Sequence, residues 1–281
     1  MALILNKIAP PTETPRISRR RLLDVLAESM TCCTSTVIHG RTGAGKTLLA
    51  ADFAARSDRR VAWYKVDAPE VDMQAFLKYL IASVRDQHPG FGRKTLALLS
   101  SSVSTTEDSK LLAESFIYEM TMLEGDEPLL IVIDDLHLLY DAEWIVPFFG
   151  RLLPLLPVEA HMILIGRTLP PAPLWRMRSK QTLRVIDESA LAFTLPEAEE
   201  LFASYGLQAK SAAQALGETW GRAAALDEAA RAQRDATGAG ESRPAATLAA
   251  KTLAANADAR TDNSRLRLVK GYAAKSSVRA T

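Results

Sequence analysis

The sequence predicts an α/β fold, in which a parallel β-sheet is flanked by helices and followed by a small helical subdomain. Three observations lead to this prediction. Short apolar runs alternate with segments of helical periodicity over residues 34–190. The runs at 128–133 and 161–166 are apolar without interruption, which is typical of strands buried on both faces of a sheet. A glycine-rich loop separates the first apolar run from the helical segment after it.

Residues 1–17 contain several prolines and threonines and are expected to form an extended N-terminal arm. Apolar residues at helical spacing from Arg19 to Met30 then predict an amphipathic helix. On this pattern alone, the arginine run that opens the segment (Arg19, Arg20, Arg21) is interpreted as the solvated face of that helix.

The remaining elements follow from periodicity and from their flanking residues. Strands are predicted at Thr34–His39, Val61–Val66, Pro128–Ile133 and His161–Gly166, with a weaker one at Leu183–Ile186. Helices are predicted at Lys46–Arg56, Asp72–Asp86, Glu107–Leu123 and Glu143–Leu153. The polar, Ser/Thr-rich stretch 88–106 is expected to be a loop.

The pattern changes after the last strand. Thr194 and Glu197 form a capping box with a proline between them, which predicts a helix running to about Tyr205. Two short helices are expected at 211–219 and 222–231. The predicted organisation is therefore an arm, an α/β domain over 18–193, a helical subdomain over 194–231 and a tail over 232–281.

The tail differs in composition from the rest of the chain. Residues 230–281 contain ten Lys/Arg and four Asp/Glu, an excess of +6, whereas the whole chain carries +1. With few aromatic residues and no sustained apolar stripe, the tail is expected to be largely disordered, with one weak helix around 244–255.

Bulk composition excludes several classes of protein. The longest apolar stretch, Trp144–Val158, is too short to span a bilayer and is broken by Arg151 and three prolines. The apolar N-terminal run is too short for a signal peptide. The two cysteines, Cys32 and Cys33, are adjacent and lack metal-ligand spacing, as expected for reduced thiols. We therefore expect a cytoplasmic protein with no membrane partner.

The glycine-rich loop carries the strongest chemical signal. It matches G-x-x-x-x-G-K-[ST] at every fixed position, as Gly40-Arg41-Thr42-Gly43-Ala44-Gly45-Lys46-Thr47. Its glycines allow successive N–H groups to face a phosphate, and the helix that starts here, including Leu48, adds a favourable dipole. Lys46 is expected to reach the β- and γ-phosphates, and Thr47 to offer its hydroxyl to Mg²⁺. The loop predicts a P-loop that binds ATP or ADP with Mg²⁺.

Two further strand ends deliver candidate residues to the same site. The run Leu129–Ile133 ends in Asp134 and Asp135, at the sheet edge where open α/β folds bind ligands. We expect Asp134 to hold Mg²⁺ and Asp135 to orient or deprotonate the attacking water. Arg167 ends the next strand, where it can sense the γ-phosphate. For His137, which follows the acid pair, packing and catalysis both stay open.

With these residues placed, the chain resembles the ATPase module of the STAND class of signal-transducing NTPases, in particular the MalT-like, large LuxR-type transcriptional activators. The likeness runs from about Lys7 to Leu226. Its motifs are Ile17-x-Arg19-x-x-Leu22, the P-loop, Trp63-Tyr64-x-x-Asp67, Ile133-Asp134-Asp135-Leu136-His137, Arg167 with Leu169-Pro170, and Leu191-Ala192-Phe193-Thr194 with Glu197. The chain departs from the family pattern by having Gly166 where a serine is usual, and Gly221-Arg222-Ala223 where Gly-Trp-Pro/Ala is usual.

The resemblance implies an AAA/STAND-like fold, a choice of adenine as base, and a position for Arg19 near the nucleotide. It also implies a switch module that binds ATP, hydrolyses it slowly and self-associates in a nucleotide-dependent way. DNA binding in this family belongs to output domains that do not fit within residues 232–281, so the chain is expected to be a truncated or stand-alone module.

Two alternatives to the switch stay open. The first is an ordinary AAA-like ATPase enzyme with fast turnover and an arginine finger acting in trans, for which the sequence offers no assignable residue. The second is weak, salt-sensitive DNA contact through the basic tail. The switch is the interpretation that the resemblance favours.

Overall fold

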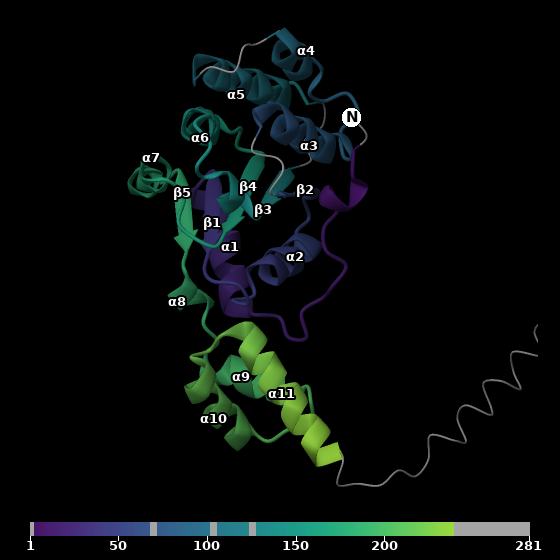
Figure 1. Cartoon of the computed structure of the whole chain (residues 1–281), viewed down its shortest axis with the longest axis vertical. Helices are drawn as coiled ribbons and strands as arrows, with labels where there is room; N and C mark the ends of the chain where they lie inside the picture. The colour runs from purple at the N-terminus through teal and green to yellow at the C-terminus, as the bar shows by residue number, and fades with distance from the viewer. Residues whose placement is uncertain (1–2, 68–71, 102–105, 124–127, 239–281) are drawn as a thin grey trace, which may run out of the picture. The chain divides into compact units, whose positions relative to one another are not determined.

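The computed structural model describes residues 3–67, 72–101, 106–123 and 128–238 (Figure 1). The chain forms two compact units, residues 1–231 and residues 232–281. Of the second unit, only residues 232–238 are described, as the end of a helix. The weak helix expected at 244–255, and most of the tail expected to be disordered, lie outside the described residues.

A five-stranded sheet forms the centre of the first unit, with strand order β2-β3-β4-β1-β5 and every neighbouring pair parallel. Its strands are β1 (Ser35–His39), β2 (Arg60–Lys65), β3 (Leu129–Asp134), β4 (Ala160–Gly166) and β5 (Leu183–Ile186). The predicted parallel α/β fold is confirmed, and the short strand β5 is part of it.

The register brings three strand ends to one edge of the sheet. β1 lies between β4 and β5, with His39 opposite Gly166, while Lys65 of β2 stands opposite Asp134 of β3. Because all strands run in the same direction, the loop after β1, the acid pair after β3 and Arg167 after β4 leave the sheet at the same side.

Helices surround the sheet and continue beyond it. The elements that precede β3 are η1 (Leu5–Lys7), α1 (Arg20–Cys32), α2 (Lys46–Arg56), α3 (Met73–Arg85), α4 (Arg93–Ser101) and α5 (Thr106–Thr121). Those between β3 and β5 are η3 (Leu136–Leu139), α6 (Ile145–Leu152), η4 (Leu153–Leu155), α7 (Ala172–Trp175) and η5 (Arg176–Lys180). After β5 come α8 (Glu188–Leu191), α9 (Leu195–Ala203), α10 (Ala209–Thr219) and α11 (Ala223–Gly238). Within the described residues, no helix combines the length and apolar character needed to cross a membrane.

Both faces of the sheet are covered, which explains the uninterrupted apolar strands (Figure 1). On β3, Ile131 and Ile133 belong to a core shared with α3, α5 and α6. Their neighbours Leu130 and Val132 point to the opposite face and pack in a second core with α1 and α2. Alternate side chains of one strand therefore fill two cores.

The loop expected over residues 88–106 is wrong for Arg93–Ser101, which forms α4. Leu99 and Thr95 of this helix are buried. The N-terminus of α4 is capped by the carboxylate of Glu119 on α5, which accepts hydrogen bonds from the N–H groups of Lys94 and Thr95 at 3.0 and 2.9 Å. A cap supplied from another helix leaves no local signal in the sequence.

Helices α9–α11 form the predicted helical subdomain around a third core, which includes Leu201, Phe202 and Leu226. Glu197 accepts a hydrogen bond from the N–H of Thr194 at 2.9 Å, as expected for a capping box. Ile17, from the end of the N-terminal arm, also packs into this core. The last helix, α11, continues past Arg231 to Gly238, beyond the point where we expected the helical subdomain to end.

Candidate functional site

The predicted P-loop connects β1 to α2, with Gly45 immediately before the helix. Gly43 and Gly45 have φ angles of +82° and +86°, in the left-handed region that residues with a side chain rarely adopt. The pattern of glycines thus permits the backbone turn by which N–H groups can face an anion.

The ammonium group of Lys46 is folded back over this loop. Its Nζ donates to the carbonyl oxygens of Gly40 at 2.6 Å and Arg41 at 3.0 Å. Burial lowers the pKa of Lys46, while the nearby charges of Asp134 and Asp135 act in the opposite direction. A cation held in this position is available to a polyanion that enters the loop.

Asp134 and Thr47 are in direct contact below the loop. The Thr47 hydroxyl donates to the Asp134 carboxylate, and Asp134 also accepts the N–H of Asp135 at 2.9 Å. Burial, followed by the charge of Asp135, raises the pKa of Asp134 to about 6. A buried carboxylate beside a hydroxyl offers the oxygen ligands that Mg²⁺ prefers.

This donor set fits a Mg²⁺ ion that is held jointly with phosphates. Among the residues that the structure describes, no group of three or more His, Cys, Asp or Glu side chains could hold a metal by itself. Mg²⁺ in nucleotide sites is typically bound by one or two carboxylates together with substrate phosphates, and it keeps several waters. Thr47 and Asp134 would therefore supply only part of its coordination.

Asp135 lies at the entrance of the site in a left-handed backbone conformation, with φ of +58°. Its Oδ1 is 3.8 Å from Nδ1 of His137, and that nitrogen has no hydrogen-bond partner among the described residues. Burial lowers the pKa of His137 and favours the neutral ring, against the pull of Asp135. The structure therefore places His137 beside the candidate base without deciding between packing and catalysis.

Two cavities meet at the P-loop. The smaller has a volume of about 270 Å³ and is lined by Thr42, Gly43, Gly45 to Leu48, Asp135 and Arg167. The larger has a volume of about 820 Å³ and shares Gly43, Gly45 and Leu48 with the smaller one. The walls of the larger cavity come from the N-terminal arm, α2, the segment before α9, and α11.

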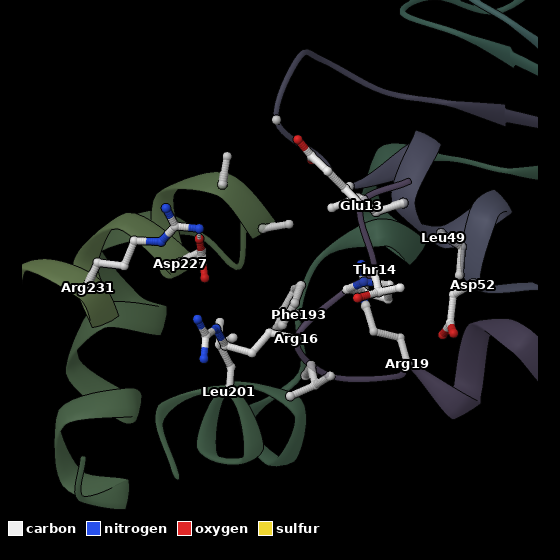
Figure 2. A pocket seen from close by; sticks show the side chains of 17 residues that line it. Glu13, Thr14, Arg16, Arg19, Leu49, Asp52, Phe193, Leu201, Asp227 and Arg231 are labelled. Atoms are coloured by element: carbon white, nitrogen blue, oxygen red, sulfur yellow. Dashed lines mark ion pairs between the residues drawn. The ribbon is translucent and has the colours of Figure 1, made fainter. Parts of the chain in front are cut away.

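Figure 2 shows the arrangement of side chains around the larger cavity. Arg19, Leu49 and Asp52 line it from α2 and the segment before α1, whereas Asp227 and Arg231 line it from α11. Phe193 contributes an aromatic ring. The cavity thus combines an apolar and aromatic surface with a few charged groups, which is typical of sites for small organic ligands.

The structure does not place all the predicted nucleotide-binding residues on one surface. Gly40, Arg41 and Ala44 shape the loop but do not line either cavity, and Asp134 is buried beneath the smaller one. Arg19 lines the larger cavity together with Gly43, Gly45 and Leu48 of the P-loop, but not the smaller cavity that Lys46, Thr47 and Arg167 line. The prediction that the arginine run is a solvated face is wrong for Arg19, whose side chain is only 7% exposed.

Sequence reasoning missed Glu188, which lies against the P-loop. Its carboxylate accepts hydrogen bonds from the backbone N–H of Arg41 at 3.2 Å and from Arg41 Nε at 2.6 Å. Glu188 begins α8, just after β5, and only the placement of β5 beside β1 brings it to the loop. No local motif indicated this contact.

The helical subdomain also contacts the P-loop directly. The N–H of Ala224, in the first turn of α11, donates to the carbonyl of Gly43 at 2.9 Å. A Cβ atom added at Gly43 would stand 2.9 Å from the Cβ of Ala224, and one added at Gly45 would stand 3.2 Å from the Cβ of Ala223. Both glycines therefore permit the close approach of α11 as well as the turn of the loop.

A protein family described as AAA ATPase domain matches residues 17–165 of the chain. The match covers α1, the P-loop, β1, β2 and β3, and all of β4 except its last residue.

Similar curated proteins are transcriptional regulators. The HTH-type transcriptional regulator MalT of Serratia proteamaculans is 33% identical over 204 residues, which are 71% of this chain and 22% of that protein. The protein of the same description from Yersinia enterocolitica is 31% identical over 203 residues, with the same two shares. The chain thus spans about a fifth of the length of these relatives.

Solved structures that the chain matches include a Walker-type ATPase of Pyrococcus abyssi, with a TM-score of 0.47 at 14% identity, covering 83% of this chain and 72% of that one. The Aeropyrum pernix ORC1 protein in complex with DNA has a TM-score of 0.45 at 16% identity, covering 83% of this chain and 64% of that one.

Proposed function

The chain belongs to the AAA ATPase domain family, and from this membership we propose that it binds ATP with Mg²⁺ and acts as the nucleotide-dependent switch of a MalT-like transcriptional regulator. Hydrolysis in such a module is slow and resets the switch. Self-association that depends on the nucleotide is part of the same proposal.

The observation that carries this proposal is the pair of adjoining cavities. The smaller one is surrounded by P-loop backbone and by Lys46, Thr47, Asp135 and Arg167, a set suited to phosphates. The larger one, lined by Phe193, by apolar side chains such as Leu49 and Leu201 and by several charged groups, has room for a base and a ribose. Because the cavities share P-loop residues, a single nucleotide can occupy both.

Each site residue then has a physical role. The N–H groups of the loop residues that line the smaller cavity, Thr42, Gly43 and Gly45 to Leu48, and the ammonium of Lys46 hold the phosphates. Thr47 and Asp134 would hold Mg²⁺, which when bound neutralises charge on the phosphate oxygens. Asp135 accepts a proton from the attacking water, and Arg167 stabilises charge on the γ-phosphate.

A switch requires a part that moves between two states. The contact between Ala224 and Gly43 supports α9–α11 as this part, because the N–H of Ala224 donates to the Gly43 carbonyl and a neutral hydrogen bond of this kind contributes only about 0.5–1.5 kcal/mol. A nucleotide seated against the loop and α11 would change the free energy of this docking, which is the differential affinity that a switch needs.

The test is the binding of ATP with Mg²⁺ to the intact chain and to Lys46→Ala, followed by turnover of the bound ATP. Lys210→Ala is the matched control, since Lys210 is exposed on α10 and lines neither cavity. We expect Lys46→Ala alone to lose binding, and the intact chain to turn over slowly. Fast turnover would favour the AAA-like enzyme, and absence of binding by the intact chain would refute the proposal.

A further inference from the structure

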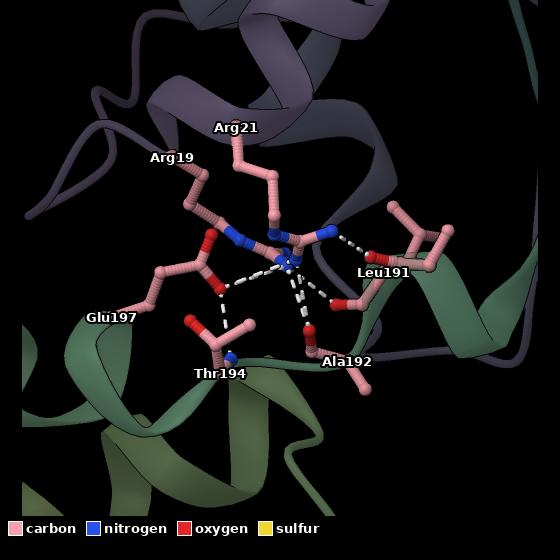
Figure 3. A network of polar contacts seen from close by, with 7 residues as sticks. Arg19, Arg21, Leu191, Ala192, Thr194 and Glu197 are labelled. Carbon is pink, nitrogen blue, oxygen red and sulfur yellow. Dashed lines mark hydrogen bonds and ion pairs between the residues drawn. The ribbon is translucent and has the colours of Figure 1, made fainter.

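Two arginines from the start of α1 hold the connector, which we define as residues 190–194, between the α/β domain and the helical subdomain (Figure 3). Arg19 Nη2 donates to the carbonyl of Leu191 at 2.7 Å and to that of Ala192 at 3.3 Å. Arg21 donates to the carbonyl of Ala190 at 3.0 Å and, like Arg19, to that of Ala192, at 3.2 Å.

Glu197 extends this network into the helical subdomain. Its Oε2 accepts hydrogen bonds from the N–H of Thr194 at 2.9 Å and from Arg21 Nη2 at 3.3 Å, and it lies 3.7 Å from Arg19 Nη2. The carboxylate that caps α9 is therefore also the counter-charge of both arginines (Figure 3). A displacement of α9 would change the surroundings of both guanidinium groups.

The two arginines differ in what else they touch. The side chain of Arg21 is 41% exposed and lines neither cavity, whereas that of Arg19 is 7% exposed and lines the larger cavity. Nε and Nη1 of Arg19 are buried and have no hydrogen-bond partner among the described residues. Nη1 lies near the P-loop, 3.8 Å from where a Cβ of Gly45 would stand.

Unpartnered buried donors on a charged group are costly and uncommon. Here they belong to the guanidinium of a residue that lines the cavity, with its carbon 4.3 Å from the centre of the Phe193 ring, which lines the same cavity (Figure 2). Burial lowers the pKa of Arg19 to about 10, so the group stays charged at neutral pH. A ligand that offers hydrogen-bond acceptors at this place would satisfy the free N–H groups.

We propose that Arg19 couples the two halves of the switch: its free N–H groups bind acceptors on the base or ribose of the nucleotide, while Nη2 holds the connector. This inference rests on the nucleotide site proposed above. Occupancy of the larger cavity then fixes the guanidinium, strengthens its bonds to Leu191 and Ala192, and favours the docking of α11 on the P-loop. Because coupling between sites is reciprocal, docking of α11 tightens nucleotide binding.

The first test separates the base and ribose from the phosphates. The dissociation constants of ATP and of inorganic triphosphate, each with Mg²⁺, are measured by calorimetry for the intact chain, Arg19→Gln and Arg21→Gln. We expect Arg19→Gln to weaken ATP binding about tenfold, which corresponds to about 1.4 kcal/mol, and to leave triphosphate binding unchanged. Arg21→Gln loosens the connector without touching the cavity, so by the same reciprocity we expect it to weaken ATP binding less than Arg19→Gln does and to leave triphosphate binding unchanged.

The second test follows hydrogen exchange of the connector and of the α11 start, with and without saturating ATP. The informative amides are those of Phe193, which donates to the carbonyl of Gly221, and of Ala224, which donates to that of Gly43. We expect ATP to slow exchange at both in the intact chain and in Arg21→Gln. In Arg19→Gln the ATP-dependent slowing should be lost even at saturation.

Arg19→Lys is the second variant, and it shows whether the effect of Arg19→Gln comes from misfolding. Lysine keeps the positive charge, but its single nitrogen replaces the three nitrogens of the guanidinium. Arg19→Lys should fold, bind triphosphate normally and show a reduced slowing of exchange. Wild-type ATP affinity and wild-type slowing in both Arg19 variants would overturn the coupling while leaving the nucleotide site intact. Equal losses for ATP and triphosphate would also overturn it, since Arg19 would then act on the phosphates. Failure of the intact chain to bind either ligand would instead refute the proposed function.

Discussion

The Thr47 hydroxyl lies 3.0 Å from Oδ2 of Asp134 and 3.3 Å from Oδ1, so the two expected metal ligands are hydrogen-bonded to each other. The hydroxyl proton satisfies a carboxylate that is 1% exposed. To hold Mg²⁺, the Thr47 and Asp134 oxygens would exchange this hydrogen bond for bonds to the ion, which when bound neutralises charge on the phosphates.

Loss of the Thr47 hydroxyl in Thr47→Val is expected to weaken ATP binding in the presence of Mg²⁺ and to leave ATP binding in its absence unchanged. Valine preserves the shape of threonine but lacks the hydroxyl, so we expect the advantage that Mg²⁺ gives to ATP affinity to fall by about tenfold, or about 1.4 kcal/mol. The check is ATP titration in Mg²⁺ and in EDTA. Thr47→Ser keeps the hydroxyl and should behave like the intact chain; an equal loss in both variants would contradict the assignment.

Asp135→Asn is expected to stop hydrolysis without stopping ATP binding. Asparagine tolerates the left-handed backbone conformation that Asp135 adopts, but it cannot accept the proton of the attacking water. We expect single-turnover hydrolysis to slow by about 10²- to 10⁴-fold, with the dissociation constant of ATP almost unchanged. Asp141→Asn, at an exposed position on the same loop region, serves as the control. Retained hydrolysis in Asp135→Asn would remove Asp135 from the role of base.

A buried histidine predicts a loss of stability in acid. His161 Nδ1 donates to the carbonyl of Cys33 at 3.2 Å, and Nε2 accepts the hydroxyl proton of Thr36, which in turn is bonded to Ser29. Burial lowers the pKa of His161 to about 4, with the charge of Arg59 acting in the same direction and the Cys33 carbonyl against it.

The direction of the change in stability depends on whether the folded or the unfolded chain protonates His161 first as the pH falls. Below pH 6.5 the unfolded chain protonates His161 whereas the folded chain resists until about pH 4, so stability is full above 6.5 and falls on acidification. We expect this residue to contribute a loss of about 2 kcal/mol between pH 7 and pH 5. Urea unfolding of the intact chain and of His161→Gln at both pH values measures it, and identical pH dependence of the two would contradict the prediction.

Two exposed glycines of the helical subdomain allow the effect of backbone conformation on stability to be measured without a change in side-chain packing. A Cβ added at Gly206 or at Gly217 meets no atom within 4 Å, but Gly206 has φ of +75° and Gly217 lies inside α10. We expect Gly217→Ala to stabilise by about 0.5–1 kcal/mol and Gly206→Ala to destabilise by about 1–2 kcal/mol. Chemical denaturation measures both, and a shift of the same sign in the two variants would contradict this reasoning.

The fold could be predicted from the sequence wherever the signal was local. The uninterrupted apolar run of β3 and the strand–loop–helix pattern around Lys46 are short-range features, and the structure shows the elements they predicted. Even the weak run Leu183–Ile186 forms β5, because β1 offers it an edge to pair with. Helix α4 could not be predicted, since the cap supplied by Glu119 comes from the following helix.

The same division applies to the candidate site. The P-loop and the acid pair could be identified from their motifs, whereas the contact of Glu188 with Arg41 depends on which strands are neighbours. The network of Arg19 and Arg21 joins residues about 170 positions apart through carbonyl groups, which every residue possesses. No residue type could have indicated those partners. Only the resemblance to a family led to the prediction that Arg19 lies near the nucleotide.

The strand order has a consequence for how the chain is made. β1 pairs with β4 and β5, so the strand that carries the P-loop has no partner until residues 160–166 have left the ribosome and lacks its second partner until residues 183–186 have followed. β2 and β3 can pair earlier, but they form one flank of the sheet. Nascent chains shorter than about 186 residues therefore lack one neighbour of β1, and pairing over such sequence separation is slow and exposes apolar strands. Arrested nascent chains that end before β5 should remain sensitive to protease at the P-loop.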